Sequence, residues 1–290
     1  MADLTDDIAG ALRAATACLA AVSETARLDS ELLMAHALGC TRSEMLLRQA
    51  DLPVPVEFAG LLARRMADEP VAYITGHQDF WDLTLAVTPD VLIPRADSET
   101  LIEVAGDAFA GRGGPGRVLD LGTGSGALLL AALSAFPKAI GLGVDASAAA
   151  LAVAAGNARG LGFAECTDFR HLNWRDAGWA EALCGPFDLI LCNPPYVEND
   201  AALAPMVAAH EPHSALFAGP DGLDEYRILI PAVPGLLAPE GIAAFEIGYT
   251  QTQAISDMAS KAGLITELRR DLGGNPRCLR FSLGIMKTGG

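Results

Sequence analysis

The segment FDLILCNPPYVEND, residues 187–200, is an apolar run that ends in Asn193-Pro194-Pro195-Tyr196. A strand cannot continue through two prolines, because proline has no N–H for the ladder and a fixed φ. The Asn193 side-chain oxygen and the Pro194 carbonyl are two acceptors that suit the two hydrogens of a planar NH₂ group. Tyr196 adds a flat face on which such a group can stack. The structural alternative is a rigid exit from the strand with a buried tyrosine.

A second candidate site is VLDLGTGSGA, residues 118–127, which follows a predicted strand and opens a predicted helix. Its glycines permit a close approach of backbone to ligand and positive φ. The spacing also fits the dinucleotide fingerprint loosely, and a tight turn without a ligand is the structural alternative. With Asp120 in front, the loop resembles the glycine motif of class I methyltransferases, which favours S-adenosylmethionine over a dinucleotide. The predicted cofactor-binding residues of the loop are Gly122, Thr123, Gly124, Ser125 and Gly126.

Two further candidates follow neighbouring predicted strands. Asp145 ends the next strand, where a carboxylate can accept hydrogen bonds from both hydroxyls of a ribose, and it can also cap the helix that begins near Ser147. Trp174 follows the third strand, where its ring can stack on adenine or pack in the core. Ligands of open α/β sheets bind beyond the carboxyl ends of the strands. We therefore expect Asp145, Trp174, the glycine loop and Asn193 to meet in one crevice.

A methyl donor beside a clamp for NH₂ predicts methyl transfer to nitrogen. The lone pair of an amide or an aromatic amine is delocalised, so the nitrogen must be held in line with the methyl–sulfur bond. The acceptors bind more strongly as positive charge builds on the nitrogen, which stabilises the transition state selectively. We predict catalytic roles for Asn193, Pro194 and Tyr196, and substrate contacts at these residues and Pro195. These residues alone do not distinguish an amide from an adenine base.

The remaining sequence predicts the elements that position these residues. Residues 1–75 have apolar residues at helical spacing, which predicts a small helical substrate-recognition domain in which Asp29 or Ser30 caps the second helix and Gly39 ends it. Residues 76–96 predict a β-hairpin linker. From residue 97 to 290 strands alternate with helices, which predicts an α/β domain with a doubly wound parallel sheet. The last two strands form a hairpin across GGNP, so an antiparallel strand is expected to end the sheet.

Composition limits the function classes. The chain is 51% hydrophobic and 19% charged, which is typical of a globular protein, and its net charge of −16 argues against duplex DNA as a partner. No apolar run approaches the roughly 20 residues of a membrane span, and the acidic N-terminus is unlike a secretion signal. We therefore expect a soluble, cytoplasmic protein. Six scattered cysteines without C-x-x-C spacing, and an HEPH segment without helical spacing, predict no metal site.

Over nearly its whole length the sequence resembles the release-factor glutamine methyltransferases of the HemK/PrmC type. DSELLMAHALG resembles the signature of their N-terminal helical domain, and EPVAYITGHQDFWDLTLAVTPDVLIPRADSETLIE resembles their domain linker and following segment. The other matching segments, in family order, are VLDLGTGSGALLLA, VDASAAALAVAAGNA, FDLILCNPPYV, EPHSALFAGPDGLDEYR, AFEIGYTQ and DLGGNPR. The resemblance implies a seven-stranded Rossmann-like methyltransferase sheet. It also implies cofactor contacts at residues 122–126, Asp145, Trp174 and Asn193, and substrate contacts at residues 193–196.

The resemblance implies methylation of the side-chain nitrogen (N5) of the glutamine in the Gly-Gly-Gln motif of class-1 peptide chain release factors. S-Adenosylmethionine would be the donor and S-adenosylhomocysteine the product. Two departures are Asn173, where the family commonly has aspartate, and Ala96-Asp97-Ser98-Glu99, where it usually reads Pro-Asp-Thr-Glu. The roles of Arg95 and Glu99 are left open.

Two other substrates stay open. A sister class with the same core methylates a glutamine of a ribosomal protein, although DSELLMAHALG favours the release factor. An adenine-N6 DNA methyltransferase could present a flipped base to the same loop, although the net charge weighs against it. The expected partner is therefore a class-1 release factor as protein substrate, with no direct nucleic acid and no membrane, and the chain is expected to be a monomer.

Overall fold

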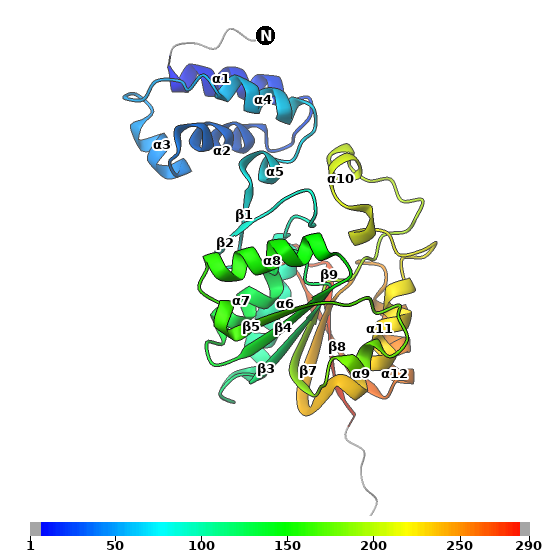
Figure 1. Cartoon of the computed structure of the whole chain (residues 1–290). Coiled ribbons are helices and arrows are strands. Elements are labelled where there is room, and N and C mark those ends of the chain that lie inside the picture. Colours follow the sequence, from blue (N-terminus) through cyan, green and yellow to red (C-terminus); the bar gives the residue numbers. More distant parts are fainter. Residues whose placement is uncertain (1–6, 285–290) are drawn as a thin grey trace, which may run out of the picture. The chain divides into compact units, whose positions relative to one another are not determined.

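The computed structural model describes residues 7–284, whose contacts divide the chain into two units (Figure 1). The first unit runs up to His77 and includes Leu203–Glu211. The second comprises Gln78–Ala202 and the residues from Pro212 onward. The predicted division into a helical domain (1–75), a hairpin linker (76–96) and an α/β domain (97–290) stays a prediction.

The first unit is helical. Apolar side chains from α1, α2 and α4, among them Ile8, Leu33 and Phe58, are fully buried and form its core. These side chains recur at helical spacing, which is the pattern that predicted the helices. The helices of this unit are α1 (Ile8–Leu19), α2 (Ala26–Leu38), α3 (Arg42–Arg48), α4 (Phe58–Met66), α5 (Val71–Thr75) and α10 (Pro205–His210).

Helix α2 begins earlier than predicted, at Ala26, so Asp29 and Ser30 do not cap it. Asp29 lies in its first turn, where the helix dipole favours a carboxylate. There it accepts hydrogen bonds from Thr25 Oγ1 at 2.8 Å and from the buried Arg65 Nε at 2.8 Å. Gly39 ends the helix as predicted, with a φ of 63°.

The second unit is built on a seven-stranded sheet in the order β5-β4-β3-β6-β7-β9-β8. Strands β3 to β7 pair with one another in parallel, and β9 is antiparallel to both β7 and β8. The α/β class, the doubly wound sheet and the C-terminal hairpin are therefore confirmed. The strands are β3 (Arg117–Leu121), β4 (Ile140–Asp145), β5 (Thr167–His171), β6 (Phe187–Cys192), β7 (Leu237–Glu246), β8 (Leu264–Arg270) and β9 (Pro276–Leu283).

The expectation that an antiparallel strand ends the sheet is wrong in position. The antiparallel strand β9 lies inside the sheet, and β8 forms the edge. Burial explains this order, because Cys278, Leu279 and Phe281 of β9 are almost fully buried, whereas Ile265 of β8 is 54% exposed. The strand with more apolar surface occupies the position that is covered on both sides.

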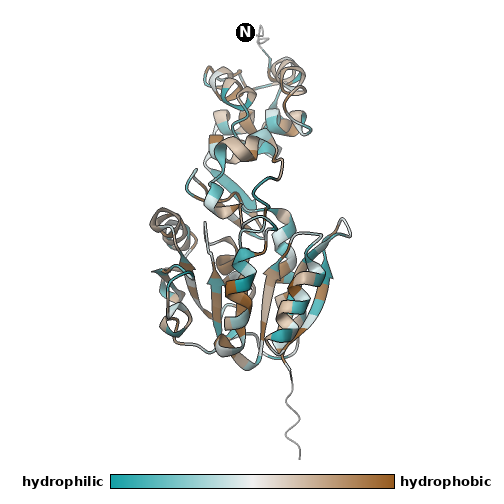
Figure 2. Cartoon of the chain, turned by 90° about the vertical axis from the view of Figure 1, so that its right-hand side faces the viewer, coloured by the Kyte–Doolittle hydropathy of each residue, from teal (hydrophilic) through white to brown (hydrophobic). Residues whose placement is uncertain are grey.

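Helices cover both faces of the sheet (Figure 1). Helices α6 (Glu99–Phe109), α7 (Ala127–Ala135) and α8 (Ala148–Gly160) contribute to one apolar cluster, and α11 (Asp224–Leu236) and α12 (Thr252–Lys261) contribute to the other. The short α9 (Trp179–Ala182) packs on the second cluster. Figure 2 shows brown, apolar residues on the strands and mixed colours on the helices, as expected for a sheet buried on both faces. No helix within residues 7–284 has the length and apolarity needed to cross a membrane.

The predicted hairpin is present as β1 (His77–Phe80) and β2 (Leu83–Ala86). Asn157 of α8 fixes it, because its side chain bonds both backbone groups of Ala86, N–H at 2.8 Å and C=O at 3.0 Å. The same Asn157 amide donates to Ser125 O in the glycine loop at 2.9 Å. The chain leaving the hairpin is thereby held beside the loop.

Candidate active site

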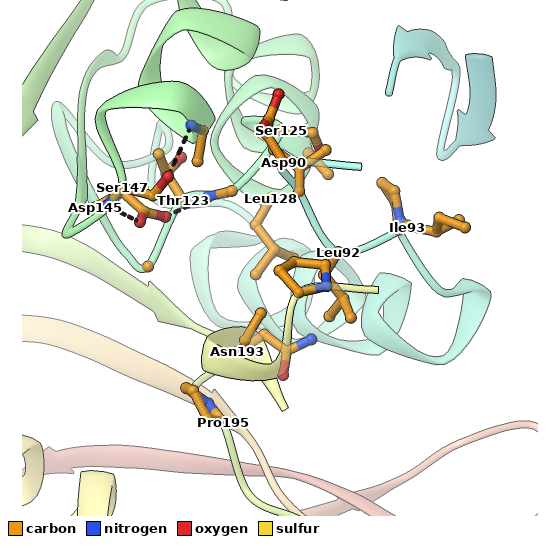
Figure 3. Close-up of a pocket in the computed structure, with 18 of the residues that line it drawn as sticks. Asp90, Leu92, Ile93, Thr123, Ser125, Leu128, Asp145, Ser147, Asn193 and Pro195 are labelled. Carbon is orange, nitrogen blue, oxygen red and sulfur yellow. Dashed lines mark hydrogen bonds between the residues drawn. The ribbon is translucent and has the colours of Figure 1, made fainter. Parts of the chain in front are cut away.

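A cavity of about 460 Å³ lies at the carboxyl ends of the parallel strands (Figure 3). Segments far apart in the sequence line it: the glycine loop after β3, Asp145 at the end of β4, Trp174 after β5 and Asn193 after β6. The segment from Pro89 to Arg95 forms a further wall. The expected crevice therefore exists.

The three loop glycines have different reasons to be glycine. All have positive φ, at 74° for Gly122, 54° for Gly124 and 84° for Gly126. A Cβ on Gly122 would lie 3.1 Å from Cη2 of Trp174, whereas a Cβ on Gly124 would meet no protein atom within 4 Å. A Cβ on Gly126 would press on Leu130 at 3.3 Å. Gly122 thus admits the tryptophan ring, Gly124 leaves space, and Gly126 permits close packing at the start of α7.

The Asp145 carboxylate joins the loop to the next helix. Its Oδ2 accepts from Gly124 N at 2.9 Å, and its Oδ1 accepts from Ser147 N at 2.8 Å (Figure 3). Ser147 itself caps α8 by accepting from Ala150 N at 3.1 Å. Each carboxylate oxygen has a second lone pair, so Asp145 can still accept from two ligand hydroxyls. Its structural and ligand-binding roles are therefore compatible.

Asp120 supports the loop from below. The residue is 1% exposed, and its Oδ2 accepts from Thr123 Oγ1 at 2.6 Å. Burial, with a further contribution from the charge of Asp145, raises the pKa of Asp120 to about 7 against the lowering effect of that hydrogen bond. Asp120 is not among the described residues that line the cavity. It therefore shapes the turn that positions Thr123.

Trp174 is held in place by a buried carboxylate. Its Nε1 donates to Glu225 Oε2 at 2.5 Å, and Arg175 pairs with the other oxygen of Glu225. Glu225 lies at the start of α11 and is 5% exposed. The tryptophan ring, which lines the cavity, thus has one orientation fixed by a hydrogen bond at its edge.

The Asn193 loop is held at several points. The Asn193 Nδ2 donates to Ser98 Oγ at 3.3 Å, and Tyr196 OH donates to Glu246 Oε1 at 3.1 Å. Burial raises the pKa of Tyr196, and the charge of Glu246 raises it further, so the phenol stays protonated. Gln251 Nε2 donates to the Tyr196 carbonyl at 3.1 Å, which fixes the backbone after the prolines.

The structure brings most of the predicted site residues together, although their roles stay predictions. The predicted residues that line the cavity are Gly122, Thr123, Gly124, Ser125, Asp145, Trp174, Asn193 and Pro195. Gly126, Pro194 and Tyr196 are not among the described residues that line it. Pro194 is buried, and the partly buried Tyr196 packs on the apolar cluster of α11 and α12.

Sequence reasoning missed several residues around the cavity. The wall at residues 89–95 has no periodicity that marks it, and Ser98 and Ser147 are unremarkable in type. Glu246 carried a usable signal, because it is a carboxylate among apolar residues and a buried carboxylate needs donors. Glu225 gave no such signal, because its neighbours in the sequence include charged residues. Among residues 7–284, no group of three or more histidine, cysteine or acidic side chains is placed to hold a metal ion.

Comparison with solved structures shows the same fold. The catalytic domain of hMettl16, solved in complex with a 3′UTR hairpin, is 12% identical, with a TM-score of 0.56 over 79% of this chain and 84% of that one. A methyltransferase from Pyrococcus furiosus is 18% identical, with a TM-score of 0.50 over 78% of this chain and 100% of that one. At these identities the likeness concerns the fold alone.

Comparison of sequences shows the family. Residues 10–76 match the PrmC N-terminal domain, and residues 98–212 match the methyltransferase small domain. A release factor glutamine methyltransferase from Rhodospirillum rubrum is 45% identical over 88% of this chain and 78% of its own length. Another from Cereibacter sphaeroides is 43% identical over 95% of this chain and 98% of its own length. The chain therefore belongs to the release factor glutamine methyltransferase family.

Proposed function

We propose that this enzyme transfers a methyl group from S-adenosylmethionine to the side-chain amide nitrogen of the glutamine in the Gly-Gly-Gln motif of class-1 release factors. The single observation that carries the proposal is the position of Asn193, which lines the same cavity as Asp145 and the glycine loop. An acceptor for a planar NH₂ group thus shares a chamber with the groups expected to bind a nucleoside.

The residues around the cavity fit the cofactor. A volume of about 460 Å³ is within the usual range of small-molecule pockets. Asp145 retains acceptor capacity for ribose hydroxyls, Trp174 presents a fixed ring for adenine, and the open space at Gly124 leaves room for the ligand. When bound, the cofactor supplies an electrophilic methyl group on a sulfonium.

The contribution of the protein at the acceptor is orientation. In this proposal Asn193 Oδ1 and the Pro194 carbonyl accept the two hydrogens of the substrate amide and so hold its nitrogen toward the methyl group. Both acceptors bind more strongly as the nitrogen becomes positive. Tyr196, fixed by its bond to Glu246, is expected to support the substrate at its flat face.

The relatives support a protein amide as the substrate over an adenine base. Those from Rhodospirillum rubrum and Cereibacter sphaeroides are both named release factor glutamine methyltransferases, and the match to the second spans both units of this chain. The formal charge of −16 suits a basic protein partner better than duplex DNA. We expect the enzyme to act as a monomer in the cytoplasm.

Radiolabelled methyl transfer from S-adenosylmethionine tests the proposal. Purified enzyme is expected to add one methyl to a class-1 release factor, and Gln→Ala in the Gly-Gly-Gln motif of that factor is expected to abolish labelling. Ribosomal protein and duplex DNA serve as parallel substrates. Labelling of either of them without labelling of the release factor would overturn the proposal.

Asn193→Ala tests the role of the acceptor in the same assay. Removing one preorganised hydrogen-bond partner of a transition state lowers kcat by about two orders of magnitude. Binding of S-adenosylhomocysteine, measured by calorimetry, should change much less, because Asp145 and Trp174 are untouched. Turnover close to that of the wild type would remove Asn193 from the mechanism.

A further inference from the structure

We propose that Ser98 and Glu246 are positioning residues that set the orientation of the Asn193 amide. They hold Nδ2 away from the substrate and leave Oδ1 as the acceptor. The inference rests on the proposed function, since it concerns how the same site binds the substrate amide.

The three side chains form a continuous hydrogen-bonded chain. Asn193 Nδ2 lies 3.3 Å from Ser98 Oγ, and Ser98 Oγ bonds Glu246 Oε2. Ser98 is 4% exposed and Glu246 is 1% exposed, so water does not compete for these groups. Asn193 and Ser98 both line the cavity, and Glu246 lies behind them at the end of β7.

Charge fixes the direction of every bond in this chain. An ionised carboxylate can only accept, so the Ser98 hydroxyl hydrogen must point to Glu246. Ser98 Oγ then has only lone pairs left for Asn193, and only the NH₂ side of an amide can donate to them. The flipped amide would place two acceptor oxygens against each other. Burial raises the pKa of Glu246, whereas the hydrogen bonds from Ser98 and Tyr196 and the charge of Arg277 lower it. In its ionised form Glu246 selects the Asn193 orientation that presents Oδ1 to the substrate.

Neighbouring groups hold the Glu246 carboxylate in place. Tyr196 OH donates to Oε1 at 3.1 Å, and Arg277 Nη1 lies 4.0 Å from the same oxygen. Tyr226 OH donates to the Glu246 main-chain oxygen at 2.7 Å. Arg277 is itself fixed by Asp97 Oδ2 at 3.0 Å. The hydroxyls of Ser98 and Tyr196 thus donate to the two carboxylate oxygens, and the Arg277 guanidinium lies at ion-pair distance, as a buried carboxylate requires.

Glu246→Gln keeps the shape of the side chain and allows the hydrogen bonds between residue 246, Ser98 and Asn193 to run in the opposite direction. The introduced amide can donate to Ser98 Oγ, whose hydrogen can then point to Asn193 Oδ1, so the Asn193 amide flips. We expect kcat on the release factor to fall at least about tenfold, approaching the loss expected for Asn193→Ala. The dissociation constant of S-adenosylhomocysteine should stay within about twofold, because Asp145 and Trp174 are untouched.

Ser98→Ala removes the preference for one orientation of the Asn193 amide without favouring the opposite one. The lost hydrogen bond is worth about 1 kcal/mol, which corresponds to about a fivefold fall in kcat. Ser98→Thr keeps the hydroxyl and is expected to restore most of the activity. Ser134→Ala is the matched control, because Ser134 Oγ also donates to a carboxylate, Asp82 Oδ2 at 2.6 Å, and Ser134 does not line the cavity.

A double-mutant cycle separates positioning from general structure. If Ser98 and Glu246 act through Asn193, neither substitution should lower kcat further in an Asn193→Ala background. Full additivity in that background would overturn the inference, as would wild-type kcat in Glu246→Gln enzyme that binds S-adenosylhomocysteine normally. If the wild-type enzyme does not methylate the release factor, the proposed function is wrong. If it does and the variants behave additively, only the positioning role of Ser98 and Glu246 is wrong.

Discussion

Gly122→Ala should disturb the cofactor site through Trp174. The new Cβ would lie 3.1 Å from Trp174 Cη2 and 3.4 Å from Cζ3, so the ring must move by a few tenths of an ångström. The ring is not free to do so, because its Nε1 donates to the buried Glu225 at 2.5 Å. The substitution therefore either displaces a wall of the cavity or strains that hydrogen bond.

Two separate free-energy costs follow from this geometry. An alanine at a φ of 74° carries left-handed backbone strain of about 1–2 kcal/mol, which lowers the free energy of unfolding. A displaced ring also loses stacking on a bound base, which is worth about 1–3 kcal/mol. The second cost corresponds to roughly a 5- to 150-fold rise in the dissociation constant of S-adenosylhomocysteine.

Gly162→Ala provides the matched control. Gly162 has a φ of 84°, and a Cβ there meets no atom within 4 Å, so the substitution carries the backbone strain alone. Both variants should lose stability in urea unfolding, and only Gly122→Ala should bind S-adenosylhomocysteine more weakly in calorimetry. Unchanged affinity in Gly122→Ala would show that the fixed Trp174 ring does not contact the cofactor.

Two further predictions concern the carboxylates of the site. The pKa of Asp120 is raised from 3.8 to about 7, so its contribution to stability is complete below pH 3.8 and is lost as pH rises through about 7. Between pH 5 and pH 8 the loss amounts to about 3 kcal/mol in the free energy of unfolding. The difference in free energy of unfolding between wild type and Asp120→Asn, measured in urea, should therefore change by that amount. A difference that does not depend on pH would contradict the raised pKa. Asp145→Asn keeps one acceptor oxygen where two now bind Gly124 N and Ser147 N, so the dissociation constant of S-adenosylhomocysteine should rise at least about tenfold. Wild-type affinity in calorimetry would exclude Asp145 as a ribose acceptor.

The parts of the fold that could be predicted from the sequence have local causes. The apolar runs of β3 and β6 and the helical spacing after them mark alternating strands and helices. Asn193-Pro194 marks the end of β6, because proline cannot continue a ladder. No local sequence pattern predicts that β9 lies between β7 and β8. That order depends on which of the two strands buries more apolar surface beside β7, which is a long-range property.

In the candidate site, too, only the residues with a local cause could be predicted from the sequence. Asp145 and Asn193 could be predicted because each ends a strand, and all parallel strands end at one edge of the sheet. Ser98 precedes Asn193 by 95 positions, and no local pattern ties the two. Only the fold brings them together.

In the hydrogen-bonded chain of Asn193, Ser98 and Glu246, Glu246 carried a signal in the sequence that Ser98 lacked. It closes a strand whose preceding residues, Ile242 to Phe245, are all apolar and at most 5% exposed. A carboxylate in such a place is costly unless several donors converge on it, so its presence predicts a buried cluster of hydroxyl and cationic side chains nearby. Strand β7 lies beside and parallel to β6, and Asn193 follows the end of β6. The cluster around Glu246 therefore lies at the carboxyl ends of the strands, where the substrate amide is expected to bind. A charge in an otherwise apolar strand can therefore point to the residues that orient an active site, even where sequence spacing cannot name them.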